Sequence, residues 1–247
     1  MKEIAERIVL WLRAQLETTG MKGFVLGLSG GVDSSVAAGL LCRACPENCL
    51  GVIMPAGNVE EDRLDAIAAA EAFHMPYLEI PLEKYRQGLF DDVKKALAAG
   101  NREIADERIG KGNIGARLRM TTLYAIGNGL SYLVVGTDNA DELYTGYFTK
   151  YGDGGVDILP LAHLSKGDVF RLGAYLGVPG RILTKPPSAG FFAGQTDEKE
   201  MGVGYDVIDA FLRGEDISES DREVIERLHR ISEHKRHLPV SMKETDL

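Results

Sequence analysis

The sequence predicts an α/β fold: a doubly wound parallel sheet of about five strands with helices on both faces, in one domain over residues 1–247. Short apolar runs of strand length alternate with segments of helical periodicity, which is typical of strands joined by crossover helices. A turn rich in glycine and serine follows the first apolar run, at 28–35. Hydrophobic residues make up 45% of the 247 residues, which is enough for a sizeable core.

The apolar runs and the residues that interrupt them predict the order of elements. Strands are expected at 24–28, 50–54, 77–80, 132–137 and 158–161. Helices are expected at 2–18, from Val36 to Ala44, and at 60–74, 85–99, 114–130, 166–176, 197–212 and 218–237. We expect Asn113 and Ser165 to cap two of these helices, and no regular element in the glycine- and aspartate-rich passage 138–157. Residues 184–196 hold two prolines and two glycines and are expected to form a loop.

The turn at 28–35 has the composition of an anion-binding loop. Gly30 and Gly31 allow a tight turn with exposed N–H groups, and the helix that follows offers unpaired N–H groups and the positive end of its dipole. These features predict a phosphate or pyrophosphate site. Asp33 would repel phosphate unless a cation such as Mg²⁺ lay between them. The alternative is that Asp33 only caps the helix and the glycines only turn the chain.

A second group of polar residues follows the strand expected at 132–137. In an open parallel sheet, ligands bind beyond the carboxyl ends of the strands, so residues 136–138 should face the same edge as the glycine-rich turn. Glu142 could bring a second carboxylate towards a metal beside Asp33, or it could be a solvated loop acid. Lys166 stands at a helix start, where the dipole disfavours a cation, so either an anion lies there or the lysine is exposed.

Two further features allow a functional and a plain structural interpretation. The segment 149–157 is rich in glycine and charge, and is either a connection or a lid that a ligand orders. Cys42, Cys45 and Cys49 form an odd, clustered set, which argues against a disulfide framework. They could serve a metal or a sulfur-transfer site, but no fourth ligand is evident, so we interpret them as packing residues.

The balance of charge bears on partners and location. The chain has 28 basic and 37 acidic residues and a net charge of −9, which gives no general attraction to nucleic acid. No apolar run is long enough to cross a bilayer, and the N-terminal segment reads as an amphipathic helix rather than a secretion signal. We therefore expect a cytoplasmic protein that binds neither nucleic acid nor membrane.

The string Ser29-Gly30-Gly31-Val32-Asp33-Ser34 resembles the PP-loop of the N-type ATP pyrophosphatases, which cleave ATP to AMP and pyrophosphate. Other segments, in order along the chain, resemble the ammonia-dependent NAD synthetases of that superfamily. These segments are 113–120, 136–139 with Glu142, 147–155, 159–161 with 165–166, 186–190, 194–198 and 234–235. Two features depart from the family pattern: Phe191-Phe192-Ala193 replaces a stretch with Leu and Trp, and the cysteine cluster is not a family feature.

The resemblance implies a Rossmann-like homodimer that converts deamido-NAD⁺, ATP and ammonia to NAD⁺, AMP and pyrophosphate through an acyl-adenylate, with Mg²⁺ as cofactor. It implies catalytic roles for Asp33 and Lys166, and metal binding by Asp33 and Glu142. The residues implied for ATP are Gly27, Leu28, Ser29, Gly30, Gly31, Val32, Asp33, Ser34, Thr137, Lys166 and Ser188. The residues implied for deamido-NAD⁺, partly across the dimer, are Arg117, Lys150, Asp157, His234 and Lys235.

Two other kinds of function stay open at this point. One is a PP-loop enzyme that adenylates a base in tRNA, which the cysteines favour and the acidic charge opposes. The other is a nucleotide-sensing module on the same fold, since fold does not determine function. The joint presence of Asp33, Glu142 and Lys166 opposes the sensing module.

Overall fold

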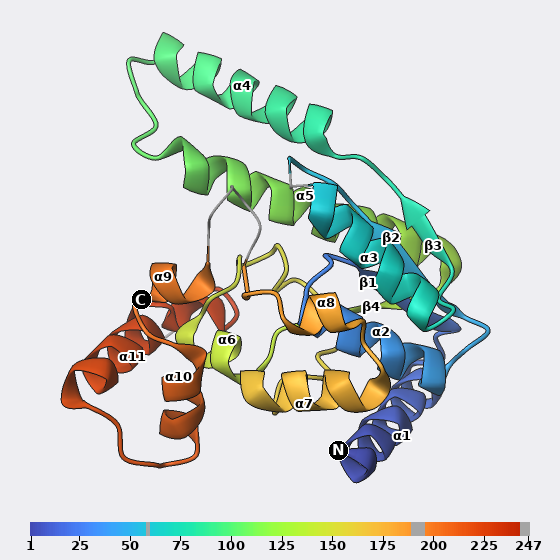
Figure 1. The fold of residues 1–247 in the computed structure, drawn as a ribbon. Helices are drawn as coiled ribbons and strands as arrows, with labels where there is room; N and C mark the ends of the chain where they lie inside the picture. The colour runs from blue at the N-terminus through green and yellow to red at the C-terminus, as the bar shows by residue number, and fades with distance from the viewer. Residues whose placement is uncertain (58–59, 189–195, 243–247) are drawn as a thin grey trace.

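The computed structural model describes residues 1–57, 60–188 and 196–242 (Figure 1). Within these residues a four-stranded, fully parallel sheet has the order β3-β2-β1-β4. The strands are β1 (Gly23–Gly27), β2 (Cys49–Ile53), β3 (Tyr77–Glu79) and β4 (Tyr132–Val135). The predicted α/β class and parallel sheet are confirmed. The strand order reverses between β1 and β4, so the topological switch point lies between these two strands.

The predicted fifth strand at 158–161 is wrong. Ile158 forms only an isolated parallel bridge with Val135, and Gly136 donates a hydrogen bond to the Ile158 carbonyl at 2.9 Å. Pro160, two residues further on, has no N–H with which to continue a ladder. Leu161 of this run is nevertheless buried in the main core, and Ile158 is partly buried against that core.

The helices occupy both faces of the sheet and the end at which the site lies. They are α1 (Lys2–Thr19), α2 (Val32–Ala44), α3 (Glu60–Ala72), α4 (Glu83–Ala99), α5 (Glu107–Leu130), α6 (Ala140–Thr145), α7 (Lys166–Leu176), α8 (Gly180–Leu183), α9 (Asp197–Met201), α10 (Tyr205–Leu212) and α11 (Glu219–Ile231). A short 3₁₀-helix, η1 (Glu233–Lys235), follows α11. No helix in the described parts of the chain is both long and apolar enough to cross a membrane.

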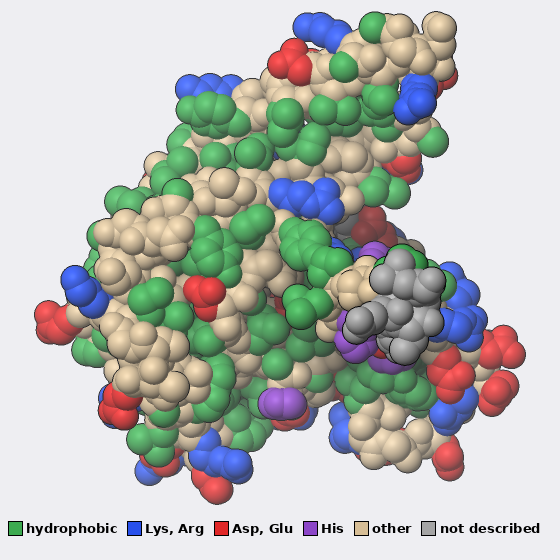
Figure 2. All heavy atoms as spheres, turned by 180° about the vertical axis from the view of Figure 1, so that it is seen from behind, with side chains coloured by type: hydrophobic (Ala, Val, Ile, Leu, Met, Phe, Trp, Pro, Cys, Tyr) green, Lys and Arg blue, Asp and Glu red, His purple; other side chains and the backbone are tan. Residues whose placement is uncertain are grey.

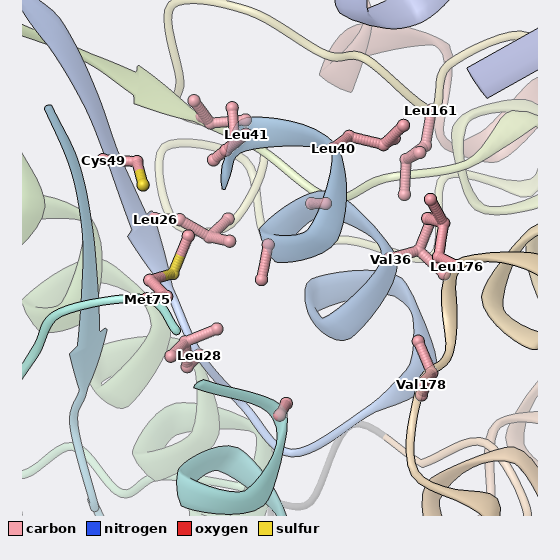
Figure 3. Packing of buried hydrophobic residues seen from close by; sticks show 14 of the residues in the cluster. Leu26, Leu28, Val36, Leu40, Leu41, Cys49, Met75, Leu161, Leu176 and Val178 are labelled. Atoms are coloured by element: carbon pink, nitrogen blue, oxygen red, sulfur yellow. The ribbon is translucent and has the colours of Figure 1, made fainter. Parts of the chain in front are cut away.

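Alternate residues of the central strand enter two separate cores. Phe24 and Leu26 of β1 pack in the larger core with apolar residues of α1, α2, α3 and α7, part of which Figure 3 shows. Val25, between them, packs on the opposite face with Val134 of β4 and Leu123 of α5. This period of two is that of a strand covered on both sides, so the prediction of helices on both faces is confirmed.

The helix expected at 114–130 begins earlier, at Glu107, where the side chain of Asp106 accepts a hydrogen bond from the N–H of Arg108. Asn113 therefore does not cap it. The glycines before Asn113 look like helix breakers in the sequence, but Gly110 lies against the ring of Phe90 on α4, where an added Cβ would come within 3.1 Å. The glycine here allows close packing of α4 on α5.

Three other predicted elements also differ. The passage 138–157 contains α6, which was not expected. The helix expected at 197–212 is two helices, because Gly202 adopts a left-handed φ of 78° and ends α9. The helix expected at 218–237 ends at Ile231 and continues only as η1. The packing of α9, α10 and α11 around Ile208 and Ile225 forms a third cluster, next to α6.

Candidate functional site

The loop between β1 and α2 is folded on its own hydroxyl groups. Ser34 Oγ donates to the Gly31 carbonyl at 3.1 Å and lies 3.0 Å from Ser29 Oγ, which in turn accepts from the Gly31 N–H at 3.2 Å. Gly31 is the N-cap of α2, so the first N–H groups of a 13-residue helix lie beside this loop. These donors and the helix dipole suit an anion such as pyrophosphate.

Gly30 is the residue at which this loop needs glycine. Its φ of 82° lies in the left-handed region, which side chains other than that of glycine rarely adopt. A Cβ at this position would lie 2.2 Å from the Asp62 carbonyl oxygen of α3. The loop is therefore both turned sharply and pressed against α3, which closes one side of the site.

The side chain of Lys166 lies between two carboxylates. Its Nζ is 2.7 Å from Asp33 Oδ2 and 3.0 Å from Glu142 Oε1, and only 3% of the side chain is exposed. Burial works against the charged lysine, but the Asp33 and Glu142 carboxylates outweigh it and raise the pKa of Lys166 above its ordinary value. Burial, with the nearby Asp33 carboxylate, raises the pKa of Glu142 to about 7, although Lys166 acts in the opposite direction.

Asn139 holds both carboxylates in place. Its side-chain amide donates to Asp33 Oδ1 at 2.9 Å, and its backbone N–H donates to Glu142 Oε2 at 3.2 Å. Its side-chain oxygen accepts from the N–H groups of Asp141 and Glu142, which completes a capping box at the start of α6. Asn139, in the loop between β4 and α6, thus connects the start of α2 to the start of α6.

These groups line one cavity of about 300 Å³ at the switch point between β1 and β4. Of the residues implied for ATP, all but Ser34 line it: Gly27, Leu28, Ser29, Gly30, Gly31, Val32, Asp33, Thr137, Lys166 and Ser188. Ser34 lies just behind, buried within the loop. Glu142 and Asp138 also line the cavity. The structure therefore brings together residues from four separate parts of the sequence.

Comparison with known proteins identifies the family. A family model described as NAD synthase matches residues 4–239. The NH(3)-dependent NAD(+) synthetase of Alkaliphilus metalliredigens is 51% identical over 95% of this chain and 95% of its own length. This chain belongs to the NAD synthase family. Members of the NAD synthase family are enzymes that form a carbon–nitrogen bond.

Comparison with two solved structures shows how similar the fold of this chain is to those of related enzymes. The NMN synthetase from Francisella tularensis is 41% identical, with a TM-score of 0.91 over 98% of both chains. The NAD⁺ synthetase from Burkholderia pseudomallei is 32% identical, with a TM-score of 0.78 over 96% of this chain and 90% of that one. The fold of this NAD synthase family member is thus closer to that of the Francisella enzyme than to that of the Burkholderia enzyme.

The residues implied for deamido-NAD⁺ do not line the cavity and contact the chain itself. Lys150 Nζ donates to the carbonyls of His234 and His237, and Lys235 Nζ donates to the carbonyls of Gly146 and Phe148. These contacts join η1 to the segment that follows α6. The chain's C-terminal turn and this segment therefore form one unit beside the cavity.

The other two residues of that set also have partners within the chain. Arg117 on α5 donates to the Lys150 carbonyl at 3.3 Å. Asp157 accepts from the Val134 N–H at 2.8 Å and from the Tyr124 hydroxyl at 2.9 Å, so it anchors the segment to β4 and α5. Its carboxylate has a structural contact in this NAD synthase family member, whatever else it binds.

The segment 149–157 is held by its own hydrogen bonds. The Thr149 N–H donates to Asp153 Oδ1 at 3.0 Å, and the Thr149 carbonyl accepts from the N–H of Gly152 at 2.8 Å. Thr149 Oγ1 also donates to Asn113 on α5 at 2.9 Å. The glycine and charge content left open whether this segment is a connection or a lid that a ligand orders, and the structure places these hydrogen bonds within it. That it acts as a lid stays a prediction.

Sequence reasoning missed a pair of buried carboxyl groups behind Lys166. Asp141 Oδ2 accepts from the Lys166 N–H at 3.2 Å, and Asp209 Oδ2 accepts from the Gly167 N–H at 3.1 Å and from Ser165 Oγ at 2.9 Å. The Oδ1 atoms of both acids are buried and have no hydrogen-bond partner among the described residues. Burial, with the neighbouring Asp209 carboxyl group, raises the pKa of Asp141 to about 8.

Tyr205 and the cysteines complete the comparison with the sequence. The Tyr205 ring lies 4.8 Å from Lys166 Nζ, and its hydroxyl donates to Asp197 Oδ2 at 3.0 Å. No motif pointed to this tyrosine, because it approaches the site from α10. Among the described residues no group of three or more His, Cys, Asp or Glu is placed to hold a metal ion. Residues 191–193, where the sequence departs from the family pattern, lie outside the described residues.

Replacing the buried cation tests the central contact. Lys166→Met leaves Asp33 and Glu142 close together without a counter-ion, and we expect the free energy of unfolding to fall by about 3–5 kcal/mol. Urea denaturation followed by circular dichroism measures the change. Lys185→Met is the matched control, because Lys185 also binds two carboxylates but its side chain is 27% exposed, and we expect a loss of about 1 kcal/mol. Equal losses in the two variants would contradict the interpretation.

The Asp141–Asp209 pair predicts how stability depends on pH. The pKa of Asp141 is about 8 in the folded chain and near 4 when unfolded. Its contribution to stability is therefore fully present below the unfolded value and is lost as pH rises towards 8. Asparagine does not titrate in this range, so Asp141→Asn removes this pH-dependent loss of stability. Relative to the unmodified chain, the variant should gain up to about 1.4 kcal/mol per pH unit between about pH 5 and 8.

Urea denaturation over that pH range measures the difference in the free energy of unfolding. Asp216→Asn is the control, because it removes one carboxylate at an exposed position of the chain. Parallel stability profiles for Asp141→Asn and the unmodified chain would show that the pKa of Asp141 is not raised in the folded chain.

Proposed function

We propose that this chain catalyses the ATP-dependent amidation of deamido-NAD⁺ with ammonia to give NAD⁺, AMP and pyrophosphate. The observation that carries the proposal is the meeting of the PP-loop, Lys166, Asp33 and Glu142 at one cavity. Support comes from relatives such as that of Alkaliphilus metalliredigens, which is named as an NH(3)-dependent NAD(+) synthetase and matches over almost its whole length. Free ammonia is the nitrogen donor on this basis.

The residues around the cavity suit the two steps of this reaction. The pyridine carboxylate attacks the α-phosphorus of ATP and releases pyrophosphate, and ammonia then attacks the acyl carbon of the adenylate and releases AMP. The N–H groups of the PP-loop and of α2 would bind the pyrophosphate as it leaves. The Lys166 ammonium would stabilise the negative charge that grows on phosphate oxygens. No protein nucleophile is needed, so the absence of a catalytic triad from the proposed site is no objection.

We propose that Asp33 and Glu142 hold Mg²⁺ together with phosphate oxygens of ATP. The fit rests on geometry: one oxygen of each carboxylate reaches the same ammonium, so both can reach one cation. Mg²⁺ prefers oxygen ligands and commonly takes one or two carboxylates plus substrate phosphates and water. Bound there, it would neutralise phosphate charge. Lys166 would have to move off one carboxylate and so become available to the nucleotide.

We also propose that two copies of the chain associate through the arm formed by α4 and α5. Tyr85, Leu89 and Val93 recur at intervals of four along α4 and are 39–53% exposed, and Ile109 on α5 is 62% exposed. Figure 2 shows hydrophobic side chains along this upper part of the molecule. Such a stripe needs a partner surface. A dimer would let Arg117, Lys150, Asp157, His234 and Lys235 serve deamido-NAD⁺ from both copies.

A mononucleotide substrate is the second candidate. The solved structure with a TM-score of 0.91 is named as an NMN synthetase, and the NAD⁺ synthetase of Burkholderia pseudomallei reaches 0.78. The residues implied for the dinucleotide lie off the cavity and bind the chain's own groups. The chemistry at the carboxylate and at ATP would be the same, and only the adenylyl half of the substrate would be missing. With either substrate, we propose that the protein is located in the cytoplasm.

A parallel assay with both substrates tests the function and distinguishes the two candidates. The protein is incubated with ATP, Mg²⁺, ammonium and either deamido-NAD⁺ or nicotinate mononucleotide, and amide product and AMP are quantified. We expect NAD⁺ and AMP in equal amounts from deamido-NAD⁺, with kcat/KM at least about tenfold above that of the mononucleotide, or ~1.4 kcal/mol. The reverse ratio would establish the mononucleotide as the substrate. ATP binding without pyrophosphate release would favour a sensing module, and turnover with tRNA would favour a base-modifying enzyme.

The dimer proposal has a separate test. Leu89→Glu places a charge within the apolar stripe of α4, and we expect the sedimentation coefficient at micromolar concentration to fall from that of a dimer to that of a monomer. Leu10→Glu is the control, since Leu10 is also highly exposed, at 62%, but lies on α1. A monomeric unmodified chain, or a dimer that survives Leu89→Glu, would contradict this interface.

A further inference from the structure

The cysteine cluster, which the proposed function leaves unused, contains two thiols in contact. Cys42 lies in the last turn of α2 and Cys49 is the first residue of β2. Their sulfur atoms are 3.4 Å apart, and both are free thiols. Cys45, the C-cap of α2, stands between them in the sequence. A contact of this kind between a helix end and a strand start is independent of the nucleotide site.

The distance between the two sulfurs is close to that needed for a covalent bond. A disulfide has an S–S length of about 2.05 Å, so the sulfurs must approach by only about 1.4 Å. Cys49 is held in the sheet by its register with Phe24 of β1 and is 3% exposed. Cys42 is partly exposed and is followed within three residues by the turn that joins α2 to β2. The approach can therefore come from Cys42.

The hydrogen bond between the thiols makes them unequal. The hydrogen bond with the Cys42 side chain lowers the pKa of Cys49, although burial opposes this. The same hydrogen bond, with burial, raises the pKa of Cys42. Because the thiolate is the reactive form, Cys49 is the better nucleophile of the two. Its sulfur lies within the main core, close to Leu41 and Leu26 (Figure 3), where larger reagents have no access.

We propose that Cys42 and Cys49 form an oxidisable thiol pair that a peroxide converts to an intramolecular disulfide. The Cys49 thiolate attacks one oxygen of hydrogen peroxide, which breaks the O–O bond, yields a sulfenic acid and releases hydroxide. The Cys42 thiol then attacks the Cys49 sulfur, the S–O bond breaks, and water leaves with the thiol proton. The protein loses two electrons and two protons, and the peroxide is reduced to two waters.

The disulfide would join the end of α2 to the sheet without disturbing the nucleotide loop. Cys42 lies ten residues after the start of α2 at Val32, or about 15 Å along the helix. We therefore expect the oxidised chain to resist unfolding better than the reduced chain, because the bond restricts the unfolded ensemble. The site is a modification site of the fold and needs no substrate for its test.

The positions of Arg43 and Glu47 allow a direct test, because cleavage after these residues places the three cysteines on three different peptides. The native protein is treated with a small excess of hydrogen peroxide, alkylated with iodoacetamide, digested with trypsin and an endoproteinase specific for glutamate without reductant, and analysed by mass spectrometry. We expect one cross-linked species that joins the Cys42 and Cys49 peptides, alkylated Cys45, and loss of the cross-link after reduction.

Variants and an unfolded control separate this pair from unspecific oxidation. Cys45→Ser should keep the cross-link. Cys42→Ser should abolish it and leave a sulfenic acid on Cys49, which dimedone traps once the peroxide has been removed and the chain is unfolded in urea. The chain oxidised in urea should give a mixture of all three pairings. Free alkylation of Cys42 and Cys49 after peroxide, their conversion to sulfinic acids without a cross-link, or the same mixture in the native and unfolded chains would each overturn the proposal.

Discussion

The contact of the Lys166 ammonium with the carboxylates of Asp33 and Glu142 is the interaction on which the rest of the site depends. Each of the three residues belongs to the first turn of a helix, namely α2, α6 and α7. Helix dipoles favour the two acids at such positions and disfavour the lysine, so the carboxylates must offset this cost as well as the cost of burial. The contacts of the Lys166 ammonium with the two carboxylates balance the charges where the three helix starts converge.

This constraint explains why several polar groups behind the site bind its charged residues and the start of α7. Asn139 bonds both carboxylates, and Asp141 and Asp209 accept from the first N–H groups of α7. Buried polar groups without partners are costly, so a site with this many charges requires a second layer of donors and acceptors. The third core cluster, around Ile208 and Ile225, holds α10 where Asp209 can supply that layer.

Local patterns in the sequence predicted the four strands of the sheet and placed Asp33 and Glu142 at its carboxyl edge and Lys166 at a helix start, whereas the roles of Glu142 and Lys166 followed only from the family resemblance. Asp33, Glu142 and Lys166 each follow a strand or start a helix, and the rule that parallel strands share one carboxyl edge brings Asp33 and Glu142 together. Helix α6 was missed although the spacing of Asn139 and Glu142 is that of a capping box. The glycines that follow it outweighed this signal.

Other features could not be predicted, because they depend on contacts between distant segments. Gly110 looks like a breaker until the Phe90 ring is seen against it. Nothing near Asp141 in the sequence indicates that it will meet Asp209, and nothing near Tyr205 indicates that its ring will lie over Lys166. The hydrogen bonds that Lys150 and Asp157 form with distant segments of the chain could not be predicted for the same reason.

The pairing of β1 with β4 has a consequence for the order in which parts of the chain fold during synthesis. Val25 pairs with Val134, and Asp33 meets Lys166 later still along the chain, whereas β1, β2 and β3 are consecutive. Contacts of such long sequence separation form slowly, and domains fold as the chain is synthesised from its N-terminus. A nascent chain that ends before Lys166 has the glycine-rich loop after β1 but not the charge that balances Asp33. The contact of Lys166 with Asp33 and Glu142 can thus form only after more than half of the chain has been synthesised.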